Sequence, residues 1–380
     1  MKYLVLFLCA FSLAAEPIRG QWYEVESDGD IVDAALLLQE LEARFAFCNR
    51  IFRFDDQNMP GLLKVRAFYD EEAYTQAVDS HRGESGPGAV YIHYWQADRR
   101  ELIVHRGSPD EQNRLPYQAF IQYLRAFVQE PPAWIRDGFA GYLSSWQWTG
   151  CDQQLVHIDE WPWLESVKPV KRNESTWKDF LTADPAANPP PEFRNLGTAV
   201  ITYLMEGGND EYYRTLIECF MNLSVEDSAQ GNTLATARRI ARWTDPEQFE
   251  NDFQAFLGKK QTFAEIFAEG QKAYTDKNLP GAEKLFKNAQ EMQPDHYAPY
   301  YYLGLVAYDS ANFAHAEQYF RKSLSYGLDF AMARYALGVN ALGAGRVDEA
   351  EDLLKQAAQS NPENYQAKVE DILKRINRRP

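Results

Sequence analysis

The sequence predicts two folded parts, an α+β domain followed by an all-α array of helix pairs. In residues 16–258, stretches with helical apolar spacing alternate with short strand-like stretches, which is typical of an α+β domain. In residues 259–380, glycine, alanine and a large apolar residue each recur at a spacing of 34 residues, which indicates a helical repeat. The chain has 380 residues, of which 45% are hydrophobic and 14% aromatic, and this is enough to form two cores.

Residues 1–15 are predicted to be a secretory signal peptide. A lysine near the start precedes an apolar run that ends in small residues, so cleavage is expected after Ala14 or Ala15. The run is too short to span a bilayer. A lipid anchor at Cys9 is disfavoured, because a small residue normally precedes such a cysteine and Leu8 is large. The expected location is an exported compartment, with a bacterial periplasm preferred and a secreted or surface location left open.

Charge and composition exclude several classes of partner. The formal net charge of −16 disfavours non-specific binding to nucleic acid or to anionic lipid, since both favour basic surfaces. No later stretch has about 18 consecutive apolar residues, so no membrane span is expected. Cys48, Cys151 and Cys219 remain after cleavage, and their odd number without close spacing predicts neither a disulfide framework nor a metal cluster. One disulfide among them is left open.

The first part of the α+β domain is predicted to contain one long helix and three strands. Residues 33–50 have helical apolar spacing, with Asp30 or Asp33 available as the N-cap. Residues 62–69, 89–94 and 101–104 have the alternation or composition of strands.

The centre of this domain is predicted to be a pair of helices within residues 117–145. Pro131 and Pro132 separate them, because a proline pair ends one helix and suits the first turn of the next. Large apolar residues recur at spacings of three and four on both sides of the prolines, so each helix has a face that packs on a core.

The second helix of this pair carries the segment from Trp134 to Tyr142, WIRDGFAGY, which resembles the W-x-x-E-G-x-A-x-Y segment of the peptidase-MA-like, or gluzincin, family of zinc peptidases. In that family a preceding helix carries H-E-x-x-H, and a small sheet borders this helix. Here the corresponding residues read YQAFI. The resemblance implies that Tyr117 and Ile121 stand at the positions of the two zinc histidines. It also places Gln118 at the catalytic glutamate and Asp137 at the third ligand.

These substitutions remove the chemistry of a zinc peptidase, which needs two imidazoles, a third ligand and a general base. Ile121 has no lone pair, and Tyr117 is neutral near pH 7 because a phenol has a pKa of about 10. Gln118 cannot act as a general base. Asp137 is the one plausible ligand among the four. We therefore expect an inactive peptidase-like domain with no metal and no cofactor. The alternative is that Tyr117 and Ile121 are ordinary packing residues and the match arose by chance.

Two other interpretations of this domain stay open. An active metallohydrolase could have a rebuilt metal site in which Asp137 is joined by His93, His105 or His157. A small polar ligand could instead bind in the former active-site cleft, expected to be lined by Tyr117, Gln118, Trp134 and Asp137.

The rest of the domain is predicted to be mainly helical. Residues 149–193 have weak periodicity. Four helices, at 199–205, 212–221, 233–241 and 246–257, are predicted to complete the domain.

The repeat of the C-terminal part has the tetratricopeptide period. Glycine recurs at 270, 304 and 338, alanine at 282, 316 and 350, and a large apolar residue at Phe286, Phe320 and Leu354. This pattern places small residues where helices touch and a large residue between them. Residues 365–378 are predicted to form a capping helix, because one face is apolar and covers the last repeat.

The resemblance to tetratricopeptide repeats implies that the first helix of each pair lines a groove that binds a protein or peptide. Binding of a partner's terminal carboxylate needs cations, whereas the groove positions carry no Lys or Arg and hold mostly aromatic or aliphatic residues. We therefore expect an extended or apolar peptide partner. The alternative is that these rings only fill the repeat interior. The groove positions are Phe267, Tyr274, Tyr301, Leu305, Tyr308, Asp309, Met332, Tyr335 and Val339.

Together these features predict an exported, non-catalytic scaffold or adaptor, in which a pseudo-peptidase domain is joined to a peptide-binding repeat module.

Overall fold

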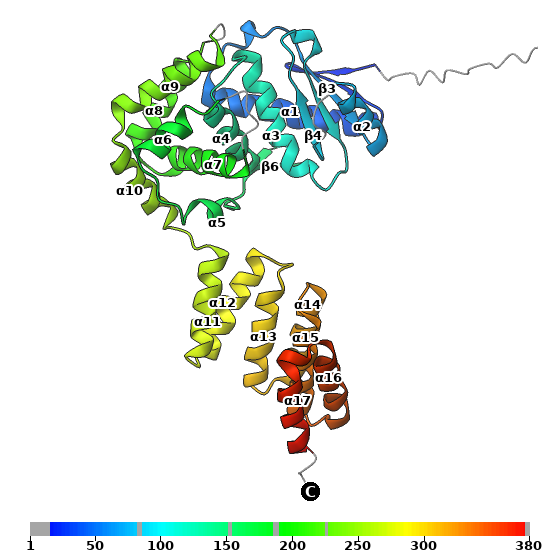
Figure 1. Cartoon of the computed structure of the whole chain (residues 1–380). Coiled ribbons are helices and arrows are strands. Elements are labelled where there is room, and N and C mark those ends of the chain that lie inside the picture. The colour runs from blue at the N-terminus through cyan, green and yellow to red at the C-terminus, as the bar shows by residue number, and fades with distance from the viewer. Residues whose placement is uncertain (1–15, 82–85, 151–153, 185–189, 225–226, 377–380) are drawn as a thin grey trace, which may run out of the picture. The chain divides into compact units, whose positions relative to one another are not determined.

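The computed structural model describes residues 16–81, 86–150, 154–184, 190–224 and 227–376 (Figure 1). It divides into two compact units, Met1–Lys259 and Lys260–Pro380. The expected signal peptide, with Cys9, and Cys151 lie outside the described residues. Cys48 and Cys219 are buried free thiols. Within the described ranges, no helix is long and apolar enough to cross a membrane.

The N-terminal unit is a mixed α/β domain with a five-stranded sheet of order β1-β2-β3-β5-β4. Strands β2, β3 and β5 run parallel to one another, and the edge strands β1 and β4 run antiparallel to β2 and β5, respectively. The strands predicted at 62–69, 89–94 and 101–104 correspond to β3, β4 and β5. Strands β1 and β2 were not predicted, although Tyr23 and Val25 alternate with polar residues and are buried. The strands are β1 (Ile18–Arg19), β2 (Tyr23–Ser27), β3 (Leu63–Phe68), β4 (Ala89–Ile92) and β5 (Glu101–His105).

Helices cover this sheet and join it to the rest of the unit. Helix α1 (Ile31–Phe52) begins after Asp30, whose side chain accepts a hydrogen bond from the Val32 N–H and so caps the helix. Helix α2 (Glu71–Asp79) lies between β3 and β4 in the chain. The predicted central pair is α3 (Glu111–Phe127) and α4 (Ala133–Ser144), separated at the two prolines. Helix α3 starts before the expected first residue, since Pro116 removes one helical hydrogen bond without ending the helix.

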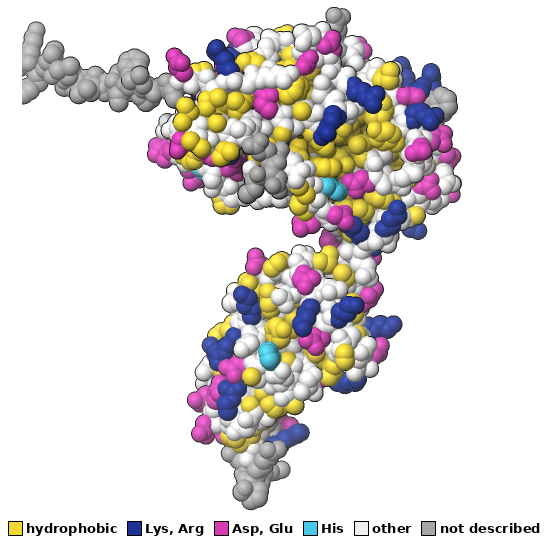
Figure 2. Space-filling view, turned by 180° about the vertical axis from the view of Figure 1, so that it is seen from behind, with side chains coloured by type: hydrophobic (Ala, Val, Ile, Leu, Met, Phe, Trp, Pro, Cys, Tyr) yellow, Lys and Arg dark blue, Asp and Glu magenta, His cyan; other side chains and the backbone are white. Residues whose placement is uncertain are grey.

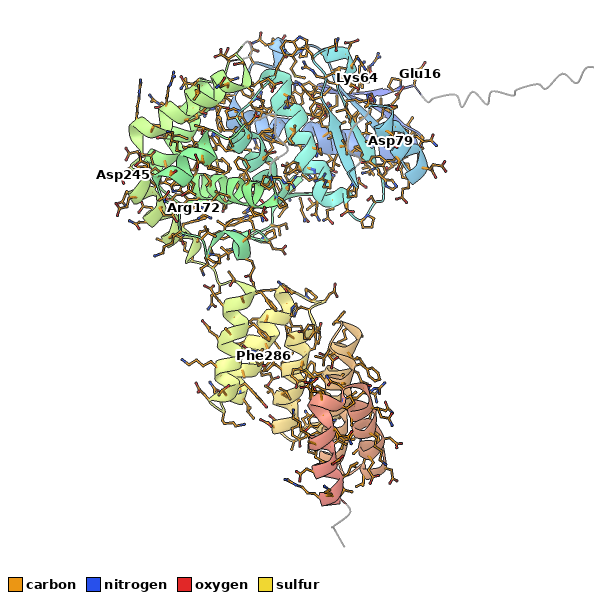
Figure 3. All side chains as sticks on the ribbon, viewed as in Figure 1. Glu16, Lys64, Asp79, Arg172, Asp245 and Phe286 are labelled. Atoms are coloured by element: carbon orange, nitrogen blue, oxygen red, sulfur yellow. The ribbon has the colours of Figure 1, made fainter. Side chains whose placement is uncertain are left out.

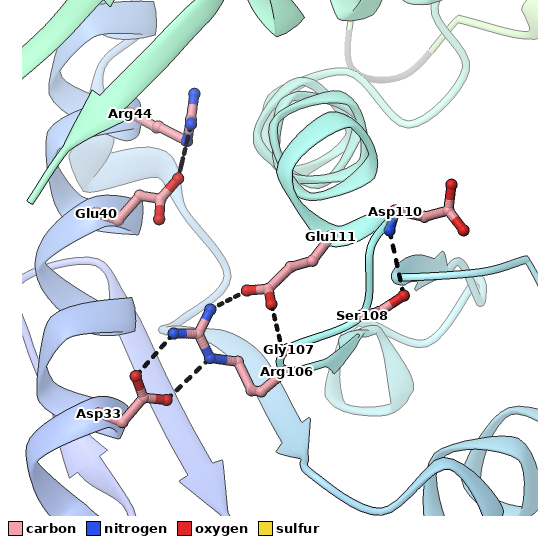
Figure 4. A network of polar contacts seen from close by, with 8 residues as sticks. All are labelled: Asp33, Glu40, Arg44, Arg106, Gly107, Ser108, Asp110 and Glu111. Carbon is pink, nitrogen blue, oxygen red and sulfur yellow. Dashed lines mark hydrogen bonds and ion pairs between the residues drawn. The ribbon is translucent and has the colours of Figure 1, made fainter. Parts of the chain in front are cut away.

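An ion-pair network fixes α1 and α3 to the end of β5 (Figure 4). The guanidinium of Arg106 donates to both carboxylate oxygens of Asp33, at 2.9 and 3.0 Å, and it also pairs with Glu111. The Glu111 carboxylate accepts a further hydrogen bond of 2.7 Å from the Gly107 N–H. Asp33 and Glu111 lie in the first turns of their helices, where negative charge is favoured by the helix dipole. The two helices are thereby aligned against the sheet.

Helix α4 packs closely against α7 (Pro191–Glu206) through a glycine contact. A Cβ atom on Gly138 would lie 2.7 Å from the carbonyl oxygen of Gly197, and one on Gly197 would lie 3.2 Å from the Cα of Gly138. Both backbones therefore need the absence of a side chain at this point. All residues of 131–140 are buried, so α4 lies at the centre of the unit.

The rest of the unit consists of a hairpin and further helices. In the region where the sequence shows weak periodicity, the structure has a two-stranded antiparallel hairpin and two short helices. The four helices predicted after residue 196 are present, and three of them begin earlier than expected. These elements are β6 (Trp146–Thr149), β7 (Gln154–His157), α5 (Leu164–Val167), α6 (Glu174–Leu181), α8 (Asp210–Met221), α9 (Ala229–Trp243) and α10 (Pro246–Leu257).

The C-terminal unit is an array of antiparallel helix pairs. Gly270, Gly304 and Gly338 lie where the helices of a pair touch: a Cβ on Gly270 would be 2.7 Å from the ring of Phe286. Phe286 lies in the interior of the first repeat (Figure 3). The last helix begins at Pro362, before the predicted start, because proline suits a first helical turn. The helices are α11 (Phe263–Thr275), α12 (Leu279–Met292), α13 (Tyr297–Asp309), α14 (Phe313–Ser325), α15 (Phe330–Gly343), α16 (Val347–Ser360) and α17 (Pro362–Ile376).

Candidate functional site

The predicted groove positions lie on α11, α13 and α15, the first helices of the three pairs. All but Asp309 are partly buried, and their inner faces contact the repeat interior. The ring of Phe267 lies 5.6 Å from that of Phe286, and Tyr301 lies 5.9 Å from Phe320. Each ring therefore fills part of its repeat and keeps another part exposed, so filling and groove lining are compatible at the same positions.

Tyrosine hydroxyls run along this helix face. Tyr274 is hydrogen-bonded to Asp309, and burial together with this contact raises the pKa of Tyr274 to about 12. Burial also raises the pKa of Tyr301 and Tyr335. These phenols stay protonated at neutral pH. The single O–H of Tyr274 already donates to Asp309, whereas Tyr301 and Tyr335 can each donate a hydrogen bond to an oxygen atom of a ligand.

The charges near this face are balanced. Lys277 lies over the Tyr274 ring at 5.5 Å and pairs with Asp309 at 3.4 Å. Because the lysine already has a carboxylate partner, a ligand carboxylate would have to compete for it. The face therefore presents neutral rings and hydroxyls beside a paired charge.

Three residues of this face were not among the predicted positions. Gln271 donates a 2.9 Å hydrogen bond to the hydroxyl of Tyr302, and the ring of Tyr302 lies 5.3 Å from that of Phe267. Tyr365 of the capping helix lies 5.1 Å from the ring of Tyr335. Sequence spacing could have found Gln271, which is one helical turn after Phe267. Tyr365 lies one 34-residue period after the start of the third repeat, so the repeat spacing could have found it as well.

In the N-terminal unit, the structure brings together two of the four residues considered in the sequence as former active-site positions, Tyr117 and Asp137. The hydroxyl of Tyr117 donates a 2.9 Å hydrogen bond to the carboxylate of Asp137. Arg136 donates to the same carboxylate at 2.8 and 3.2 Å. Burial, and secondly the Asp137 charge, raises the pKa of Tyr117 well above its usual value, so the hydroxyl stays protonated. The Asp137 side chain is thus held in a buried network.

The other two positions contact the sheet and the core. The side-chain oxygen of Gln118 accepts a 3.1 Å hydrogen bond from the Tyr91 N–H of edge strand β4. Ile121 is partly buried and packs on the main core. At this site Gln118 therefore satisfies a backbone donor of the sheet edge, for which an amide oxygen is sufficient.

An open cleft of about 540 Å³ lies beside Tyr117. Its wall includes Arg114, Arg194 and Glu160, so it is more polar than expected. The expected lining was wrong in three respects: Trp134 lines a different cavity, Asp137 is 3% exposed, and Gln118 is bonded to β4. The sequence could not show this, because it does not reveal that residues 133–140 of α4 are all buried.

The histidines proposed as replacement ligands are engaged elsewhere. His93 lies 3.2 Å from the Tyr91 hydroxyl, and burial lowers the pKa of His93 to about 3. His105 stacks on the ring of Tyr74 at 5.2 Å, and His157 lies 3.4 Å from Glu206. Among the residues that the structure describes, no three His, Cys, Asp or Glu side chains are grouped so that they could hold a metal ion.

The helix pairs of the C-terminal unit described above stack into a solenoid. The family model for the tetratricopeptide repeat matches residues 267–331 and 335–370, so this unit contains tetratricopeptide repeats. No curated protein matches the chain.

Solved structures of repeat domains are similar to part of the chain. The N-terminal domain of stress-induced protein-1 (STI-1) from C. elegans is 19% identical, covering 29% of this chain and 92% of its own, with a TM-score of 0.26. The Arabidopsis OM64 TPR domain is 21% identical, covering 30% of this chain and 94% of its own, with a TM-score of 0.28. The first TPR of Spaghetti (RPAP3), bound to the HSP90 peptide SRMEEVD, is 15% identical and covers 29% and 94%, with a TM-score of 0.27.

Proposed function

We propose that the chain is an exported, non-catalytic scaffold whose tetratricopeptide array binds an extended, largely apolar segment of a partner protein. The observation that carries this proposal is the row of half-buried rings on α11, α13 and α15, with protonated hydroxyls among them. Partly exposed aromatic faces bury apolar side chains, and neutral hydroxyls bond the backbone oxygens of an extended segment. The paired state of Lys277 disfavours a partner recognised by its terminal carboxylate.

We further propose that the N-terminal domain is a degenerate peptidase-like domain. The helix pair α3 and α4, the small sheet beside α3, and the meeting of Tyr117 and Asp137 support this proposal. The present residues leave the carboxylate bound to Arg136 and the phenol protonated, so neither group is available as a metal ligand.

Peptide binding is tested with the full mature chain, residues 16–380, by fluorescence anisotropy. Two labelled peptides are compared: an apolar peptide with blocked ends, and an acidic peptide with a free terminal carboxylate. We expect binding of the blocked apolar peptide. Because buried aromatic residues dominate such interfaces at about 2 kcal/mol or more each, Tyr308→Ala and Tyr335→Ala should each weaken binding about thirtyfold.

The matched control is Gln318→Ala, on the exposed face of α14, which should leave affinity unchanged. Circular dichroism of each variant checks that the helices are retained. Binding that requires the free carboxylate, or that survives both tyrosine substitutions, would contradict the groove proposal.

The absence of zinc chemistry is tested by measuring the metal content of the mature protein after excess zinc and gel filtration. We expect less than about a tenth of an equivalent, because catalytic sites use three protein ligands. A full equivalent that is lost in Asp137→Ala would instead indicate a rebuilt metal site.

Export is tested separately. The N-terminal sequence of the protein released by osmotic shock should begin near residue 15 or 16.

A further inference from the structure

A second cavity, apart from the groove and from the cleft beside Tyr117, lies within the N-terminal unit. It has a volume of about 330 Å³, within the usual range of ligand pockets, and is bounded by α6, α7, α8, α9 and α10 together with the start of α4. None of the residues proposed for peptide binding contributes to it. The cavity therefore calls for an explanation of its own.

The cavity wall is almost entirely hydrocarbon and aromatic ring. Trp134, Trp177 and Phe180 form one part, and Leu216 and Phe249 form another. Figure 2 shows hydrophobic side chains gathered over the later helices of this unit, with Lys or Arg side chains among them. Such a wall favours an apolar ligand over a polar one, since few polar groups face the interior.

Two cations stand at the opening from different helices. Lys178 on α6 and Arg238 on α9 both line the cavity and are exposed to solvent. Neither forms an ion pair with another described residue. Glu174, one turn before Lys178, is the acidic side chain on the same lining, so the opening has a net positive charge. Charge and apolar depth together specify a ligand with an anionic head and a hydrocarbon tail.

We propose that this cavity binds a single-chain amphiphile with an anionic head group, of the medium-chain carboxylate class. The hydrocarbon chain lies between Trp177, Leu216 and Phe249, and the carboxylate lies at the opening near Lys178 and Arg238. The chain buries apolar surface on entry, and the exposed head keeps its solvation in part, so no bare charge is buried. This inference goes beyond the proposed scaffold function and is independent of it.

The test measures, by isothermal titration calorimetry, the affinity of the full mature chain for octanoate, decanoate and dodecanoate, each kept below its critical micelle concentration. Each buried CH₂ contributes about 0.8 kcal/mol, which is about a fourfold change in affinity, so each step of two carbons should tighten binding about fifteenfold until the cavity is full. A terminally brominated dodecanoate should quench part of the tryptophan fluorescence, because Trp134 and Trp177 line the cavity.

Two kinds of variant locate the ligand. Ala237→Phe places a ring in the cavity and should weaken dodecanoate binding at least tenfold; Ala241→Phe, on a more exposed lining position, serves if the first variant unfolds. Lys178→Gln combined with Arg238→Gln should weaken dodecanoate binding two- to tenfold at low salt and leave dodecanol unchanged. Arg242→Gln, an exposed cation on α9 outside the lining, is the matched control and should have no effect.

Three outcomes would overturn the proposal. One is no binding of any of the three carboxylates, and another is binding and quenching that neither cavity-filling variant reduces. The third is equal loss of dodecanoate and dodecanol in the double glutamine variant. Vesicles of phosphatidylglycerol separate the sources of the ligand: binding to vesicles without binding of free dodecanoate would indicate a membrane surface and contradict a free amphiphile.

Discussion

The hydrogen bond between Tyr117 and Asp137 offers a direct test of the network that occupies the centre of the N-terminal unit. Tyr117→Phe removes one hydroxyl and leaves the ring in place. The lost hydrogen bond is 2.9 Å long, and its acceptor is the carboxylate of Asp137, a residue that is only 3% exposed. A hydrogen bond to a charged group contributes about 1.5–3 kcal/mol. Because Arg136 still donates to the carboxylate, we expect the lower end, a loss of about 1.5 kcal/mol in the free energy of unfolding.

The assay is urea unfolding followed by tryptophan fluorescence. All nine tryptophans lie in the N-terminal unit, so their fluorescence reports this unit without the repeat array, and the two-unit chain need not unfold in one transition. Tyr69→Phe, at a side chain that is 43% exposed, is the control and should change stability by less than about 0.5 kcal/mol.

A double-mutant cycle makes the result specific to the pair. In an Asp137→Ala background the hydroxyl has lost its acceptor, so adding Tyr117→Phe should cost nothing further, and the coupling energy should be about 1 kcal/mol or more. A loss below about 0.5 kcal/mol in Tyr117→Phe, or the same loss in both backgrounds, would refute the argument that this bond holds the carboxylate.

Three further predictions concern the same unit. Gly138→Ala should lower the free energy of unfolding by about 1–3 kcal/mol, because the new Cβ would lie 2.7 Å from the Gly197 carbonyl oxygen; tryptophan fluorescence in urea measures it. Gln118→Ala should cost about 1 kcal/mol and speed hydrogen exchange of the Tyr91 amide, which loses its acceptor. His93→Asn should flatten the loss of stability on acidification. The folded pKa of this histidine, about 3, lies below the unfolded value of about 6.5, so its contribution is present above pH 6.5 and is lost as the pH falls toward 3.

Each of these predictions has its own control. Gly150→Ala, where a Cβ would meet no atom within 4 Å, should leave stability unchanged; an equal loss at both glycines would argue against the helix contact. Gln118→Glu keeps a side-chain oxygen and should preserve slow exchange. For His93→Asn, a pH profile parallel to that of the original protein would show that this histidine is not titrating differently in the two states.

Sequence spacing predicted the C-terminal unit well, because the contacts that define it are local and repeat. Gly304 meets Phe320 within one helix pair, and the same contact recurs one period on between Gly338 and Leu354. The 34-residue spacing therefore reflects contacts that recur in each helix pair. The groove positions expected on the first helix of each pair lie on α11, α13 and α15.

The polar contacts of the N-terminal unit were much less predictable. Gln118 bonds to Tyr91, a residue that is distant in sequence, and this depends on where an edge strand lies beside a helix. Adjacent residues of a helix usually point apart, yet Arg136 and Asp137 are paired. The apolar cavity is lined by residues of six helices, and no single helix has a pattern that reveals it. Such features arise only when tertiary packing is known.

The glycine contact between α4 and α7 has a consequence for how this domain can evolve. Gly138 and Gly197 meet backbone to backbone. A larger residue at one of the two positions would therefore clash with main-chain atoms of the other helix, and no change of side-chain rotamer could relieve that clash. Among chains of common ancestry, these two positions are expected to stay glycine or to change together with the spacing of the two helices. Ile121, which is only partly buried, is free of that restriction and can drift among apolar residues on its own.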